Sequence, residues 1–194
     1  MKKQIKTGLI LCISIIAIGL SACKKEKDDP NITYLSFNKT TNNTAVPSMT
    51  IDSIDVNKDG IIDLIFGTFR QSADTQYVQF EGSYIAFAVN DAAQYIDAHF
   101  VKLFSKDEMP ALYNELTENY NTSEYFGAKI GASSFGTDGK GEVYLAFGMK
   151  PEDSSDDIYY GWLRINIAAD YSTVKIMDGA ISDVANKTIA IGAK

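Results

Sequence analysis

Short runs of alternating apolar and polar residues are the feature that most constrains the fold of this chain. Ten such runs, rich in β-branched and aromatic residues, are separated by Gly, Asn, Asp and Ser. Period-two alternation in many short segments is typical of antiparallel sheets with one solvated face. The predicted strands are Ile32–Phe37, Ser48–Ile54, Ile61–Phe69, Gln76–Phe80, Tyr84–Asn90, Ala98–Phe104, Glu142–Met149, Ile158–Ala168, Ser172–Ile181 and Thr188–Ile191.

These strands together predict one all-β domain, mainly antiparallel, over residues 32–194. So many short strands in one domain favour a β-sandwich or a jelly-roll-like fold. Residues 110–117 depart from this alternation, because good helix formers there follow a proline suited to a first helical turn. We therefore expect one short helix. The polar stretch Asn38–Pro47 predicts a turn.

The first 22 residues have the layout of a secretory signal peptide. Lys2, Lys3 and Lys6 form a positive start without acid, and an apolar run follows from Gly8 to Leu20. An N-terminal membrane helix is the alternative. The apolar run is short for that role, since a spanning helix needs about 20 apolar residues.

Leu20-Ser21-Ala22-Cys23 resembles the lipobox of bacterial lipoproteins. The resemblance implies cleavage before Cys23, acyl chains such as palmitate on that cysteine, and a lipidated tether over residues 23–31. Each buried lipid CH₂ contributes about 0.8 kcal/mol, so two or three acyl chains anchor a protein stably to a membrane. The charged cluster Lys24–Pro30 is similar to the tethers of surface-displayed lipoproteins in Bacteroidetes-type bacteria. This implies a place in the cell envelope, at the outer membrane, with surface display as an option.

The charge of the mature chain limits its partners. All 25 acidic side chains lie after residue 22, and loss of Lys2, Lys3 and Lys6 leaves 15 of the 18 basic ones, a net charge of −10. We expect no binding of nucleic acid to so acidic a chain. With Cys12 removed and Cys23 lipidated, no cysteine remains for a disulfide or a thiol nucleophile.

One loop has the spacing of a calcium site. In Asp55-Val56-Asn57-Lys58-Asp59-Gly60-Ile61-Ile62-Asp63, side-chain oxygens stand at positions 1, 3, 5 and 9, and glycine stands at position 6. Calcium takes about six to eight oxygen ligands from a chain that wraps around it. We predict calcium ligands from the side chains of Asp55, Asn57, Asp59 and Asp63 and from the carbonyl of Ile61.

The calcium loop is not an EF-hand, because position 12 is Phe66 rather than Glu and both flanks are predicted strands. It resembles the calcium loops at β-hairpins in FG-GAP and related β-propeller repeats, where Asp closes the site at position 9. The alternative is an ordinary turn, since Asp, Asn and Gly are common turn residues. The expected role of the ion is structural.

Tyr159–Ile167 is the most distinctive strand. Its alternation places Tyr160, Trp162 and Arg164 on the face away from the core. Aromatic rings beside a guanidinium group could stack on sugars, which makes this face a candidate glycan-binding surface. The alternative is that a helix or a loop covers Trp162.

No catalytic site is evident, so we expect binding rather than catalysis. His99 is the only histidine and lies in a predicted strand, which favours a structural role over a catalytic triad. A pair of carboxylates could still carry out glycoside hydrolysis. With 25 acidic residues, however, no spacing selects a pair.

Tyr160-Gly161-Trp162-Leu163-Arg164, followed by Val174–Ala180, is similar to the C-terminal region of exported β-rich proteins of Bacteroidetes-type bacteria. Those proteins often also carry an Asp-x-Asn-x-Asp-Gly-x-x-Asp loop upstream, as Asp55–Asp63 does here. The resemblance implies an exported β domain and transfers no activity. The sequence thus predicts a lipid-anchored envelope module with structural calcium, whose partner is the membrane and either a glycan or an envelope protein.

Overall fold

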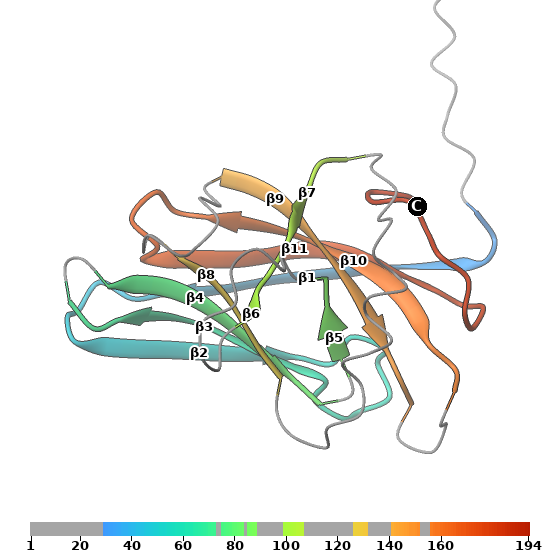
Figure 1. The fold of residues 1–194 in the computed structure, drawn as a ribbon, viewed down its shortest axis with the longest axis horizontal. Coiled ribbons are helices and arrows are strands. Elements are labelled where there is room, and N and C mark those ends of the chain that lie inside the picture. Colours follow the sequence, from blue (N-terminus) through green and yellow to red (C-terminus); the bar gives the residue numbers. More distant parts are fainter. Residues whose placement is uncertain are drawn as a thin grey trace, which may run out of the picture.

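The computed structural model describes residues 29–72, 75–83, 85–88, 99–106, 126–131, 141–151 and 156–194. These residues form eleven β-strands and no helix, so the predicted all-β class is confirmed (Figure 1). Nowhere in those ranges is there a helix long and apolar enough to cross a membrane. The predicted helix at 110–117, the signal peptide and Cys23 lie outside the described residues.

The first sheet, sheet A, contains six strands, and every pairing within it is antiparallel. Five of its strands follow one another in hydrogen-bonded order, and β7 pairs with β9 beside them. The strands in this order are β1 (Ile32–Asn42), β11 (Thr173–Ser182), β10 (Tyr159–Ile167), β9 (Gly141–Met149) and β5 (Ile85–Phe87), with β7 at Leu103–Phe104.

The second sheet, sheet B, contains five strands. Its pairings are antiparallel except for the parallel contact of β6 with β8. The predicted mainly antiparallel pattern is therefore confirmed. The strands in order are β2 (Ser48–Ile54), β3 (Leu64–Arg70), β4 (Gln76–Gly82), β8 (Phe126–Gly131) and β6 (His99–Phe100).

One apolar cluster joins the two sheets. Leu35 and Leu163 enter it from sheet A, and Phe66 and Phe80 enter it from sheet B. Figure 1 shows β2, β3 and β4 running below β10 and β11. The cluster contains side chains from both groups of strands. Burial of such side chains contributes about 1.5–3 kcal/mol each, so the shared cluster is the main source of cohesion between the sheets.

Sheet A is buried on part of its other face as well, which the alternation alone did not predict. Trp162 and Tyr144 pack there in a second apolar cluster together with Ile189 and Ile191 of the C-terminal segment. The predicted strand Thr188–Ile191 is therefore wrong, because this segment has no strand assignment and covers the sheet with two isoleucine side chains.

The predicted turn Asn38–Pro47 is also partly wrong, because β1 continues through its first half to Asn42. The pairing of β1 with β11 shifts register between Ser36 and Lys39, and Asn38 there adopts a left-handed backbone with φ of 51°. A bulge of this kind lets an edge strand continue past an irregularity in its pairing. Beyond it Lys39, Thr40 and Asn42 are exposed and Thr41 is buried.

Strand β8 was not predicted. Its sequence, Phe-Gly-Ala-Lys-Ile-Gly, contains two glycines, and glycine is depleted in strands. Its pairing with β4 is a long-range interaction that local propensity does not report. The predicted strand Ala98–Phe104 is divided into β6 and β7, which belong to different sheets.

The second cluster makes a prediction about stability. Ile191→Ala should lower the free energy of unfolding by about 2–5 kcal/mol, because it leaves a cavity over Trp162. Val184→Ala, in the same segment but exposed, should change it by less than about 0.5 kcal/mol. Urea unfolding of both variants measures this. Equal effects of the two substitutions would show that the C-terminal segment does not hold sheet A.

Candidate metal centre

The loop Asp55–Asp63 connects β2 to β3 at one end of sheet B. Two left-handed residues allow it to wrap tightly: Lys58 has φ of 63° and Gly60 has φ of 95°. A side chain at Gly60 would meet no neighbouring atom, so glycine is required there by the backbone conformation rather than by space. Gly60, at position 6, thus allows the sharp turn of the loop.

The side chains at positions 1, 3 and 5 turn back onto the loop. The Asp55 carboxylate accepts hydrogen bonds from the amide of Lys58 at 2.6 Å and from the amide of Gly60 at 2.8 Å. Asn57 Oδ1 accepts from the Asp59 amide at 3.0 Å, and Asp59 Oδ1 accepts from the Ile61 amide at 2.8 Å. Oxygen atoms therefore line the concave side of the loop.

Asp63 at position 9 is the buried member of the set. Its side chain is 9% exposed, and Oδ2 accepts hydrogen bonds from the amides of Val56 at 2.7 Å and of Asn57 at 3.3 Å. Burial raises the pKa of Asp63, and the negative charges of Asp59 and Asp55 raise it further, while the two amide hydrogen bonds lower it. A cation near this carboxylate would relieve both unfavourable contributions.

A small hollow lies beside these groups. It has a volume of about 30 Å³, and its walls include Asn57, Asp59, Asp63 and Lys150. About 10–15 Å³ is enough for one water molecule, so a single ion or water fits. Lys150 places a competing positive charge at the same hollow.

The loop is not a closed metal cage as it stands. In the described part of the chain, no three side chains of His, Cys, Asp or Glu are grouped closely enough to hold a metal ion. Asn57 Nδ2 donates to Asp59 Oδ2 at 2.8 Å, so these two predicted ligands meet each other directly. An ion would have to replace that hydrogen bond and draw Asp55 inward. The oxygen donors suit calcium, but the loop would have to close slightly to bring them all to one ion.

The candidate ligand face on β10 is not available to a ligand. Trp162 is 1% exposed and Tyr160 is also buried, because the C-terminal segment covers both. The Trp162 ring packs against Tyr144 at a centroid distance of 5.7 Å and against Tyr34 at 6.3 Å. The prediction of an exposed aromatic platform at Tyr160, Trp162 and Arg164 is therefore wrong, and the alternative of a covered Trp162 holds.

Arg164 is engaged within the sheet. Its Nε donates to Asp178 Oδ1 at 2.8 Å, and a second guanidinium nitrogen pairs with the other oxygen of that carboxylate. The hydrogen bond to Asp178 raises the pKa of Arg164. Tyr34 also donates to Asp178, and burial together with this bond raises the pKa of Tyr34 to about 12. The cluster acts as a cross-strand clamp between β1, β10 and β11.

Two further sequence candidates can be placed in the described part of the chain. His99 lies in β6, where it pairs with Ala128. Asp59 and Asp63 share the small hollow, which is far below the roughly 300–1,000 Å³ of a ligand pocket and cannot admit a sugar ring.

The buried charge of Asp63 predicts that the free energy of unfolding depends on pH when a chelator keeps the protein free of calcium. Because its folded pKa is raised above 3.8, the folded state binds the proton more tightly than the unfolded state. Stability is therefore lost as pH rises from 3.8 through the raised pKa. Asp63→Asn keeps an oxygen acceptor without the charge, so it should be more stable than wild type above that pKa and lose this advantage below it.

Asp170→Asn is the matched control for urea unfolding across pH. A hydrogen bond from Ser172 lowers the pKa of Asp170, so its substitution should be neutral or destabilising at neutral pH. If Asp63→Asn is less stable than wild type at neutral pH, the two amide hydrogen bonds outweigh the cost of burial.

Comparison of the chain with protein-family models, with curated proteins and with solved structures finds no match. The resemblance to exported proteins of Bacteroidetes-type bacteria therefore stays a prediction. Function has to be argued from the residues of this chain.

Proposed function

We propose that this protein is a lipid-anchored β-sandwich of the cell envelope, stabilised by calcium in the loop Asp55–Asp63, and that it acts as a binding or structural module. The observation that carries the proposal is the loop itself. Four oxygen-bearing side chains at calcium spacing lie on a tight turn, and one of them, Asp63, is buried with a raised pKa. Two sheets that share one apolar cluster support the sandwich arrangement.

The physical benefit of calcium at this loop is charge compensation. Asp55, Asp59 and Asp63 place three carboxylates on nine residues, and no basic residue lies among them except Lys58. A divalent cation offsets their mutual repulsion and takes oxygen ligands from side chains and from the carbonyl of Ile61. Because the loop joins β2 to β3, the ion would hold the edge of sheet B together.

The anchor and the domain are close in sequence. Asp29 is the first described residue, and its amide donates to the carbonyl of Lys194 at 3.0 Å. Residues 23–28 therefore separate the proposed lipid on Cys23 from the folded domain. Six extended residues reach about 20 Å, so the proposed anchor would keep the domain next to the membrane surface.

Calcium should raise the melting temperature of the mature chain carrying Cys23→Ala. Extracellular modules bind calcium at about 10⁻⁴–10⁻³ M, so calcium near 10 mM should add about 1.4–2.7 kcal/mol, or about 3–10 °C. Asp59→Ala should abolish the increase. Asp170→Ala, which removes an acid from the β10–β11 turn, should retain it. Identical melting curves with calcium and with chelator would show that the loop is an ordinary turn and binds no calcium.

The anchor is tested separately in a bacterial host that processes lipoproteins. The full chain should take up labelled palmitate and sediment with membranes. Cys23→Ala should lose the label and leave the membrane fraction, whereas Cys12→Ala, within the proposed signal peptide, should behave as wild type. Label on Cys23→Ala, or membrane retention without label, would contradict lipidation at Cys23.

A further inference from the structure

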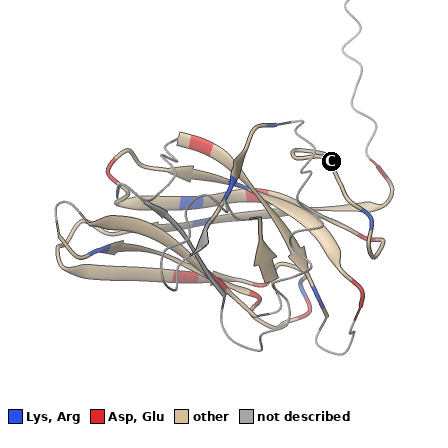
Figure 2. Ribbon diagram, viewed as in Figure 1, with Lys and Arg blue, Asp and Glu red and all other residues tan. Residues whose placement is uncertain are grey.

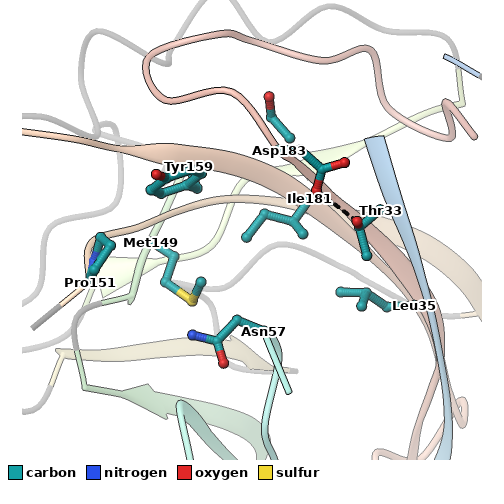
Figure 3. A pocket seen from close by; sticks show the side chains of 9 residues that line it. Thr33, Leu35, Asn57, Met149, Pro151, Tyr159, Ile181 and Asp183 are labelled. Atoms are coloured by element: carbon teal, nitrogen blue, oxygen red, sulfur yellow. Dashed lines mark hydrogen bonds between the residues drawn. The ribbon is translucent and has the colours of Figure 1, made fainter. Parts of the chain in front are cut away.

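A larger pocket lies beside the calcium loop and is distinct from it. It has a volume of about 300 Å³, which is at the lower end of the range for small-molecule sites. Asn57 borders it from the loop, and strands β1, β9, β10 and β11 of sheet A supply most of the other walls (Figure 3). The pocket therefore opens at the end of the domain where the loop meets sheet A.

The floor of this pocket is apolar. Leu35 and Ile181 come from neighbouring strands, and Met149 and Tyr159 face each other across the β9–β10 pair. Leu35, Met149 and Ile181 are buried side chains of the main core, and the ring of Tyr159 packs against that core. Figure 3 shows them around a common space, with the Met149 side chain reaching toward its middle. Such walls suit an apolar ligand body.

Among the described residues that line the pocket, Asp183 at the rim is the charged one. Thr33 Oγ1 donates to Asp183 Oδ1 at 2.7 Å, and the Asp183 amide donates to the carbonyl of Asn31 at 2.8 Å. These two hydrogen bonds fix the residue at the pocket mouth. Among the described residues, Asp183 Oδ2 receives no hydrogen bond, so one carboxylate oxygen remains for a ligand.

The charge around the pocket favours a cation. None of the described residues that line it is Lys or Arg, and the mature chain has an acidic excess. Acidic residues lie in several loops of the described surface (Figure 2). An ammonium group placed at Asp183 would gain a charge-assisted hydrogen bond.

We propose that this pocket binds a small organic cation: an ammonium group on Asp183 and an apolar aryl or alkyl body against Leu35, Met149 and Ile181. The site goes beyond the proposed calcium function and does not use the ion. Asn57 borders both, so the ligand is tested with calcium present, which keeps a failure of one proposal separate from a failure of the other.

The probe is 2-phenylethylamine, and 2-phenylethanol is its neutral counterpart of similar shape. Both are titrated into the mature chain carrying Cys23→Ala, and the ¹³C-methyl signal of Met149 is followed by NMR after assignment with Met149→Leu. The amine should shift this signal saturably. The alcohol should bind at least tenfold more weakly, because it cannot form an ion pair with Asp183.

Asp183→Asn should weaken the amine at least tenfold and leave the alcohol unchanged. Asp170→Asn removes the same charge at a distant turn and should have no effect. If the melting curve of Asp183→Asn shows that this variant does not fold, Thr33→Val is the deciding test. It removes the hydroxyl that holds Asp183 and should weaken binding of the amine severalfold. The proposal is overturned by an unshifted Met149 signal, by equal affinity for amine and alcohol, or by unchanged amine binding in the folded Asp183 variant.

Discussion

The two sheets of this domain bury one apolar cluster between them, and the rest of the structure depends on that shared core. Leu163 of sheet A and Phe66 of sheet B meet in it, so the inner faces are closed. On the outer face of sheet A, Ile189 and Ile191 of the C-terminal segment join Trp162 in a second buried cluster. The sites proposed for this domain lie at the end of the sheets, at the β2–β3 loop and the adjoining pocket.

Three acidic residues, Asp55, Asp59 and Asp63, lie in the loop at that same end. Asp63 is held at the edge of the core by amide hydrogen bonds from Val56 and Asn57, which ties the loop geometry to a carboxylate whose burial is unfavourable. A buried acid is costly unless it is protonated or paired. The proposed calcium ion would make this feature favourable. Asn57 borders both the loop hollow and the larger pocket, so the two sites share part of their walls.

Local patterns predicted a large part of this structure. Strand β2 was predicted with its observed bounds, Ser48–Ile54. The spacing of Asp55–Asp63 also led directly to the loop on which those side chains turn inward. Period-two patterning and turn chemistry are local properties, and the sequence displays them directly.

Long-range packing is what these patterns could not show. Nothing near Trp162 in sequence indicates that residues 189 and 191 will cover it, and the same alternation would describe an open aromatic face. Strand β8 contains two glycines, so local propensity did not predict it, and it forms through its pairing with β4. The pocket at Asp183 was missed for the same reason, because its walls come from β1, β9, β10, β11 and the β2–β3 loop. A Thr and an Asp separated by 150 residues give no sequence signal of contact.

The central claim is that the Asp55–Asp63 loop binds calcium through its own oxygens. A calcium titration followed by the backbone ¹⁵N–¹H signals of the mature chain tests it most directly. The account predicts saturable shifts at one ion per chain for the amides that donate to loop carboxylates, Lys58, Gly60 and Ile61, with magnesium displacing calcium poorly. Unmoved loop signals, or weak unsaturated shifts spread over many acidic residues, would contradict it.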